Sequence, residues 1–117
     1  MRYMFIVTSA QVASPTPALL TAMGKLADRE TKAGRMIGNA GLMPLASGAR
    51  VQISGGKLNV TDGPFVEAKE VIGGYAIMEL RNKEEAVASA VEFMQLHKDH
   101  LPGWEGTCEV REFASPH

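Results

Sequence analysis

The segment ARVQISGGKLNVTDG, residues 49–63, carries the clearest periodic pattern in the sequence and divides the chain into two halves. Apolar residues alternate with polar ones on both sides of the Gly55–Gly56 pair. They are Val51 and Ile53 before the pair, and Leu58 and Val60 after it. Alternation with a period of two is typical of strands, and a glycine pair suits a tight turn. The segment is therefore predicted to form a β-hairpin.

The residues before the hairpin predict a strand, a helix and a second strand. RYMFIVTS (2–9) is a short apolar run with the composition of a strand. SPTPALLTAMGKLADRETKAG (14–34) repeats apolar residues at helical spacing, with Thr16 as the cap and Pro17 at the first helical position. RMIGNAGLMP (35–44) contains two glycines and is predicted to be a strand with a bulge.

The residues after the hairpin repeat this order. GGYAIMEL (73–80) is a predicted strand, and NKEEAVASAVEFMQLHKDH (82–100) a predicted helix, in which Asn82 and Glu85 form a capping box. TCEVREF (107–113) is the last predicted strand. The second helix is expected to bury one apolar face, made of Ala86, Val87, Ala90, Val91, Phe93 and Met94.

Two strand–helix–strand halves with an inserted hairpin predict a ferredoxin-like βαββαβ sandwich of the α+β class, a single domain over residues 1–117. Both helices would cover one face of the sheet. Apart from the hairpin, no residues remain to cover the other face. A second copy of the chain is the simplest cover, so a homodimer packed through the open sheet face is expected.

Composition limits the function classes. The chain has 117 residues, 45% of them apolar and 21% charged, with a formal net charge of −1. No basic stripe is present, which argues against direct nucleic-acid binding. The apolar runs are too short to span a membrane, and the first residues lack the parts of a signal peptide. A single cysteine, Cys108, excludes an internal disulfide. These features predict a cytoplasmic protein.

The sequence at the end of the hairpin and just after it is similar to the sequences of a known family. The sequence reads DGPF at 62–65, EAKE at 67–70 and GGY at 73–75. In these blocks the chain resembles the DGPF-type proteins of the YCII-related family. Three further stretches agree with this resemblance: KAGRMIGNAGLMP, GARVQISGGK and QLHKDHLPGWEGTCEVREF.

The resemblance implies a dimeric α/β barrel built from ferredoxin-like subunits, in agreement with the element order. It does not supply a reaction. Some YCII-like relatives look like small lyases or hydrolases that use a His–Asp pair, with the histidine on the first helix. The first predicted helix, residues 16–33, contains no histidine. That mechanism is therefore not carried over to this chain.

The DGPF block admits a structural and a functional interpretation. In the structural one, Asp62 accepts hydrogen bonds from nearby backbone N–H groups in an Asx turn, Gly63 allows positive φ, Pro64 fixes its own φ and Phe65 anchors the loop in the core. In the functional one, Asp62 ends a strand beside a cleft and serves as a base or a ligand acceptor. Gly63, Pro64 and Phe65 would then contact the ligand.

Charged residues around this block could orient a small polar or anionic ligand. Glu67 and Lys69 are two residues apart and would project to the same side of an extended segment. Arg50 lies in the first strand of the hairpin. The alternative without a ligand is that Glu67 and Lys69 form an exposed ion pair that contributes little to stability.

His97 and His100 are three residues apart and share a face if the second helix reaches that far. His97 continues the stripe of Ala90 and Phe93, so it is a candidate general acid or base, with His100 as a ligand contact. The alternative is favourable placement of two imidazoles at a helix end. No metal site is predicted, because H-x-x-H lacks further ligands.

Three more observations complete the predictions. Cys108, in a strand with no basic neighbour, is expected to be inert. Trp104 is expected to plug a groove edge or the dimer seam. The glycines match no dinucleotide or phosphate-binding motif, so no cofactor is predicted.

Two function hypotheses remain. In the first, the protein is a small enzyme or ligand binder with a cleft between the sheet and the DGPF loop. Asp62 or His97 would handle protons, while Lys69 and Arg50 would orient the ligand. In the second, it is a non-catalytic interaction module, and DGPF is a corner that holds the hairpin.

Overall fold

The computed structural model describes residues 1–10, 14–63 and 71–114. The elements, in chain order, are β1 (Arg2–Ser9), α1 (Pro17–Lys32), β2 (Met36–Gly41), the short 3₁₀ turn η1 (Leu45–Ser47), β3 (Ala49–Ser54), β4 (Lys57–Asp62), β5 (Val71–Glu79), α2 (Lys83–His100) and β6 (Thr107–Glu112). Every strand and helix predicted from the sequence is present. None of the described helices is long and apolar enough to cross a membrane.

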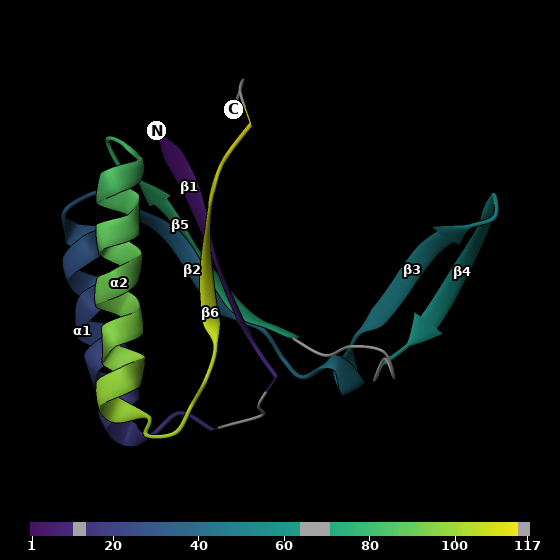
Figure 1. Ribbon diagram of the computed structural model, residues 1–117, viewed down its shortest axis with the longest axis horizontal. Helices are drawn as coiled ribbons and strands as arrows, with labels where there is room; N and C mark the ends of the chain where they lie inside the picture. Colours follow the sequence, from purple (N-terminus) through teal and green to yellow (C-terminus); the bar gives the residue numbers. More distant parts are fainter. Residues whose placement is uncertain (11–13, 64–70, 115–117) are drawn as a thin grey trace.

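Four strands form an antiparallel sheet in the order β2-β5-β1-β6, and α1 and α2 lie side by side on one of its faces (Figure 1). The order and the helix placement are those of a ferredoxin-like α+β fold, as predicted. Strands β3 and β4 pair only with each other. We call residues 49–62, which these two strands and their turn comprise, the arm.

Local signals in the sequence explain where the elements begin and turn. The Thr16 hydroxyl accepts a hydrogen bond from the Leu19 N–H at 3.1 Å and caps α1. The Asn82 side chain accepts one from the Glu85 N–H at 2.9 Å and caps α2. Gly55 and Gly56 have φ angles of 58° and 76°, which suit a tight hairpin turn. The caps, the turn and the predicted bulge in β2 are confirmed.

The core lies between the helices and the sheet. Its main cluster of buried residues comes from β1, β5 and the segment around α2, and consists of Tyr3, Phe5, Met78, Leu80, Ala86 and Ala90. The prediction that Val87 and Val91 belong to this face is wrong, because 43% and 61% of their surfaces are exposed. Each follows a buried alanine by one residue, about 100° around the helix, which turns it away from the sheet.

The opposite face of the sheet carries no helix in the part of the chain that the structure describes. Tyr3 and Phe5 contribute to the core, so by strand alternation the residues between and after them face the other way. The cross-strand pairs Met4–Ile77 and Ile6–Tyr75 form the centre of this open face. All four residues are only partly buried.

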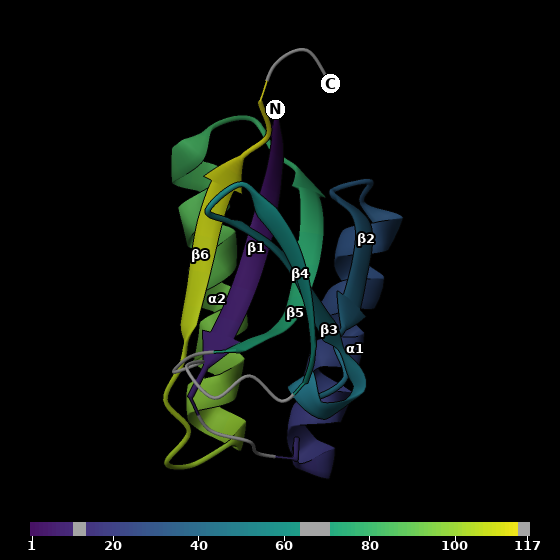
Figure 2. The same ribbon diagram turned by 90° about the vertical axis from the view of Figure 1, so that its right-hand side faces the viewer.

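The arm extends from the body of the subunit on the side of the sheet opposite the helices (Figure 1), and the view along that direction shows it in front of the sheet (Figure 2). Its base is closed by a hydrogen bond of 2.9 Å from the Gly63 N–H to the Gly48 carbonyl oxygen. Gly63 has no room for a side chain, because a Cβ there would collide with the Leu45 carbonyl oxygen.

Candidate functional site

A cavity of about 600 Å³ lies between the helix layer and the sheet. This is the size of typical small-molecule sites. Its described lining is mostly apolar and includes Phe5, Val7, Leu19, Met23, Ala76, Met78, Phe93, His97 and Trp104. The lining thus draws on β1, β5, both helices and the segment that leads from α2 to β6. The cavity therefore forms only when these elements pack together.

Two buried titratable groups, Glu30 and His97, are among the described residues that line this cavity. His97 has 8% of its surface exposed. Its Nδ1 lies 3.1 Å from the Phe93 carbonyl oxygen. A carbonyl oxygen only accepts, so Nδ1 carries a hydrogen and the neutral imidazole holds its free lone pair on Nε2. His97 is buried, as its place on the stripe of Ala90 and Phe93 predicted, and Nε2 is the atom that can accept a hydrogen bond or a proton.

Two aromatic rings fix the His97 ring in place. The Phe93 centroid lies 4.6 Å from it, and the Trp104 centroid lies 4.9 Å away at an interplanar angle of 38°. Gly106 permits this arrangement: a Cβ there would collide with the Trp104 ring and would lie 2.8 Å from the Thr8 carbonyl oxygen. Trp104 was predicted to plug a groove edge or the dimer seam, and it is among the residues that line this cavity.

Glycines line another part of the cavity. Gly24 is on α1, Gly41 ends β2, and Gly73 and Gly74 lie near the start of β5. A Cβ at Gly24 or Gly73 would meet no heavy atom within 4 Å. In sequence, β5 follows directly after residue 70, where the EAKE block ends. At Gly24 and Gly73, both lining residues, a side chain would therefore enter open space.

The structure separates the two residues that were predicted to handle protons. Asp62 is exposed at the end of β4 in the arm, and it is not among the residues that line the His97 cavity. Arg50 lies in the arm opposite Thr61 and is partly buried. Pro64, Phe65, Glu67 and Lys69 lie outside the described residues.

Gly63 and His100 serve the architecture through their main chains. Gly63 closes the base of the arm without positive φ, so the predicted reason for a glycine there is wrong and the lack of space beside Leu45 replaces it. The His100 carbonyl oxygen accepts a hydrogen bond of 2.6 Å from the Thr16 hydroxyl. This bond joins the end of α2 to the start of α1.

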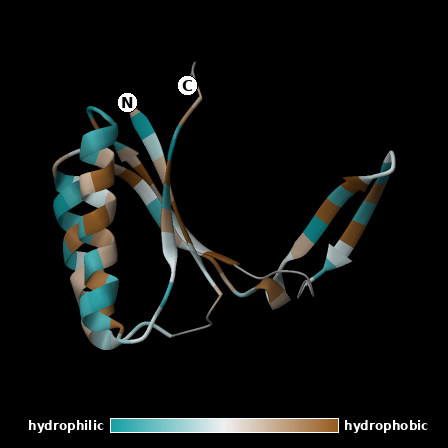
Figure 3. Cartoon of the chain, in the orientation of Figure 1, coloured by the Kyte–Doolittle hydropathy of each residue, from teal (hydrophilic) through white to brown (hydrophobic). Residues whose placement is uncertain are grey.

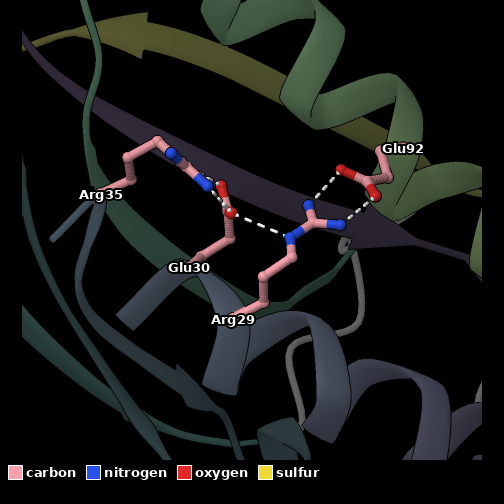
Figure 4. A network of polar contacts seen from close by, with 4 residues as sticks. All are labelled: Arg29, Glu30, Arg35 and Glu92. Atoms are coloured by element: carbon pink, nitrogen blue, oxygen red, sulfur yellow. Dashed lines mark hydrogen bonds and ion pairs between the residues drawn. The ribbon is translucent and has the colours of Figure 1, made fainter. Parts of the chain in front are cut away.

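A second hollow, between the two helices, holds a network of charged residues (Figure 4). Arg35 binds the Glu30 carboxylate through Nε at 3.0 Å and Nη2 at 2.6 Å, and Arg29 Nε approaches it at 3.2 Å. Arg29 also binds Glu92 with both terminal nitrogens, at 2.9 and 2.6 Å. Because these arginines bind carboxylates, the network joins α1, α2 and the start of β2 and has a structural role.

Glu30 is only 4% exposed, and Arg29 and Arg35 bind its carboxylate. Hydrogen bonds from Arg35, and then from Arg29, lower the pKa of Glu30 against the opposing effect of burial. Sequence reasoning missed this network. Its only signal is a glutamate at the end of a helix followed five residues later by an arginine.

Cys108 is the single thiol of the chain and is partly buried. Burial raises the pKa of the Cys108 thiol to about 11, so it stays protonated at neutral pH, in agreement with the predicted lack of reactivity. Within residues 1–10, 14–63 and 71–114, no three histidine, cysteine or carboxylate side chains gather to hold a metal ion.

Comparison with known proteins supports the resemblance seen in the sequence. No curated protein matches the chain. The YCII-related domain matches residues 1–95, from β1 into α2. His97, Trp104 and Gly106 therefore lie just beyond the matched region. Because the match covers most of its length, the chain belongs to the YCII-related family.

Proposed function

We propose that the protein binds a small, largely apolar molecule in the cavity between its helices and its sheet. The observation that supports this proposal most directly is the position of His97. Phe93 and Trp104 orient its ring beside an apolar cavity of about 600 Å³. Pockets that combine apolar walls with a few oriented polar groups are typical ligand sites.

The lining indicates the chemistry of the ligand. Glu30 is the one charged residue among the described lining residues, and its carboxylate is bound by Arg29 and Arg35. No described cation lines the cavity to balance an anionic ligand. Nε2 of His97 favours a ligand with a hydroxyl or N–H donor, and the neighbouring rings favour a planar, aromatic body. The described cavity thus supports a more apolar ligand than the sequence predicted.

The same geometry supports a catalytic alternative, in which His97 takes a proton from the bound molecule. The hydrogen bond from Nδ1 to Phe93 leaves Nε2 as the basic nitrogen, as general base catalysis requires. Asp62 has no part in this version, because it does not line the cavity.

A screen of aromatic fragments by ligand-observed NMR tests the binding proposal. His97→Phe keeps a ring between Phe93 and Trp104 but removes the acceptor, so donor-bearing fragments should bind about tenfold more weakly. Gly24→Leu adds a side chain where a Cβ has open space and also favours the helix. It should abolish binding without lowering the melting temperature.

The matched control is Val91→Leu, on the exposed side of α2, which should leave binding unchanged. If fragments bind Gly24→Leu as tightly as the natural sequence, they do not occupy this cavity, and the proposal fails.

The protein is further proposed to act in the cytoplasm as a homodimer packed through the open sheet face. The partly buried centre of that face, with Met4, Ile6 and Ile77, supports this assembly, and the single cysteine supports the reducing location. Light scattering should give twice the chain mass, and Ile6→Glu should give a folded monomer. A monomer from the natural sequence would contradict the dimer.

A further inference from the structure

The arm is an amphipathic ribbon with one apolar face. Its cross-strand pairs Val51–Val60 and Ile53–Leu58 alternate with the polar pairs Arg50–Thr61, Gln52–Asn59 and Ser54–Lys57. The four apolar residues are 68–75% exposed in the isolated subunit. Figure 3 shows this alternation as brown and teal bands along both strands. Such an apolar row is the pattern of a strand pair with one covered face.

Nothing in the described part of the subunit supplies that cover. The strands of the arm pair with each other and not with the four-stranded sheet, and every residue of β4 is exposed. A two-stranded hairpin alone in water is marginally stable at best, and needs a packing partner to hold its shape. The arm therefore requires a surface outside its own subunit.

A second copy of the chain fits this requirement by position. The arm and the open face of the sheet lie on the same side of the subunit, opposite the helices (Figure 1). A partner that packs on the open face therefore comes within reach of the arm. In a two-fold dimer both arms make the same contact, which closes the assembly without leaving an apolar row exposed.

The areas of the apolar face of the arm and of the open sheet face also fit a dimer interface. From standard strand dimensions, one face of a pair of six-residue strands covers about 200 Å², and one face of a four-stranded sheet of this length about 500 Å². A stable interface buries about 800 Å² on each partner. Either surface alone falls short of that area, and together they approach it.

We propose that the arm reaches across to the partner subunit and packs the apolar face formed by Val51, Ile53, Leu58 and Val60 against it. This inference rests on the proposed dimer and adds to it a contact that the open sheet face does not provide. The partner offers an exposed apolar group outside the centre of its open face, Ile37 on its edge strand β2.

The test compares two lysine substitutions at neighbouring positions of β3, whose side chains lie on opposite faces of the arm. Ile53→Lys puts a charge on the apolar face, and Gln52→Lys puts the same charge on the polar face. The change occurs twice in a symmetric dimer, and each buried aliphatic side chain accounts for roughly tenfold or more in affinity. Ile53→Lys should therefore raise the dissociation constant of the dimer about 100-fold in analytical ultracentrifugation, and Gln52→Lys should not.

A second measurement avoids mutation. In a dimer mixed from isotope-labelled and unlabelled chains, filtered NOE spectra should show contacts from the arm methyl groups to the partner subunit. Absence of such contacts, or equal effects of the two lysines, overturns the role of the arm.

The outcomes separate the two proposals. If the natural sequence is a monomer, both the dimer and the arm contact fail. If Ile6→Glu dissociates the dimer but Ile53→Lys leaves its dissociation constant unchanged, the sheet-to-sheet dimer stands and the arm contact fails.

Discussion

Trp104 lies against the imidazole of His97, with the ring centroids 4.9 Å apart, although the two residues belong to different segments. The contact joins the loop after α2 to the helix itself and forms one wall of the cavity. It exists because Gly106 has no side chain that would collide with the indole. The cavity thus depends on a residue that has no side chain.

Gly106→Ala should displace the indole from His97. Its Cβ would collide with the ring on one side, while the Thr8 carbonyl oxygen, 2.8 Å away on β1, limits movement of the main chain. Since Trp104 is the only tryptophan, its emission reports this site alone and should shift to the red as the ring meets water. Gly38→Ala is the control, because a Cβ there has open space. Unchanged emission in Gly106→Ala would show that the loop can adapt.

Thr16 should be more important than an ordinary cap, because its hydroxyl also donates to His100 at the end of α2. Thr16→Val removes both bonds and should lower the free energy of unfolding by about 1–3 kcal/mol in urea titrations. Thr16→Ser keeps the hydroxyl and should stay close to the natural sequence. A loss in Thr16→Ser as large as the loss in Thr16→Val would contradict the role of the hydroxyl.

Glu30 should make stability depend on pH in the acid range. Its pKa is lowered in the folded state, so its contribution is fully present above the unfolded value near 4.5 and is lost as the pH falls through the folded value. Glu30→Gln should cost about 1–3 kcal/mol at neutral pH, and the difference should shrink below about pH 4.5. Denaturant titrations at several pH values measure it.

The control for Glu30 is Glu85→Gln, which breaks an ion pair with Arg81, a residue whose side chain is 87% exposed. Its effect should be clearly smaller. A gap between Glu30→Gln and the natural sequence that stays constant down to pH 3 would contradict the ionic role of Glu30.

The elements of this fold could be predicted because their signals are local. Thr16 and Asn82 cap helices with their own side chains, and Gly55–Gly56 turns the hairpin with its own φ angles. Which apolar residues are buried is not local. Val87 and Ala86 are adjacent and both apolar, and only the position of the sheet decides that Ala86 is buried.

The site could be predicted only in part for the same reason. His97 lies on the helix stripe that starts at Ala86, so its burial follows from spacing. Its contact with Trp104 depends on how the loop folds back, and spacing does not encode that path. Asp62 looked close to a cleft in sequence, but the projection of the arm places it on an exposed strand end.

The glycine of the DGPF block yields the last prediction. Gly63→Ala would drive a Cβ into the Leu45 carbonyl oxygen and strain the hydrogen bond to Gly48 that closes the arm. Overpacking of this kind costs about 1–3 kcal/mol, which corresponds to about 5- to 150-fold faster amide exchange in β3 and β4 if the arm opens locally. Hydrogen exchange followed by NMR measures it residue by residue.

Asp62→Asn is the matched control: its side chain is exposed, so it should leave exchange in the arm unchanged. If Asp62→Asn speeds exchange as much as Gly63→Ala, the aspartate holds this corner together, and the lack of space beside Leu45 does not explain the glycine.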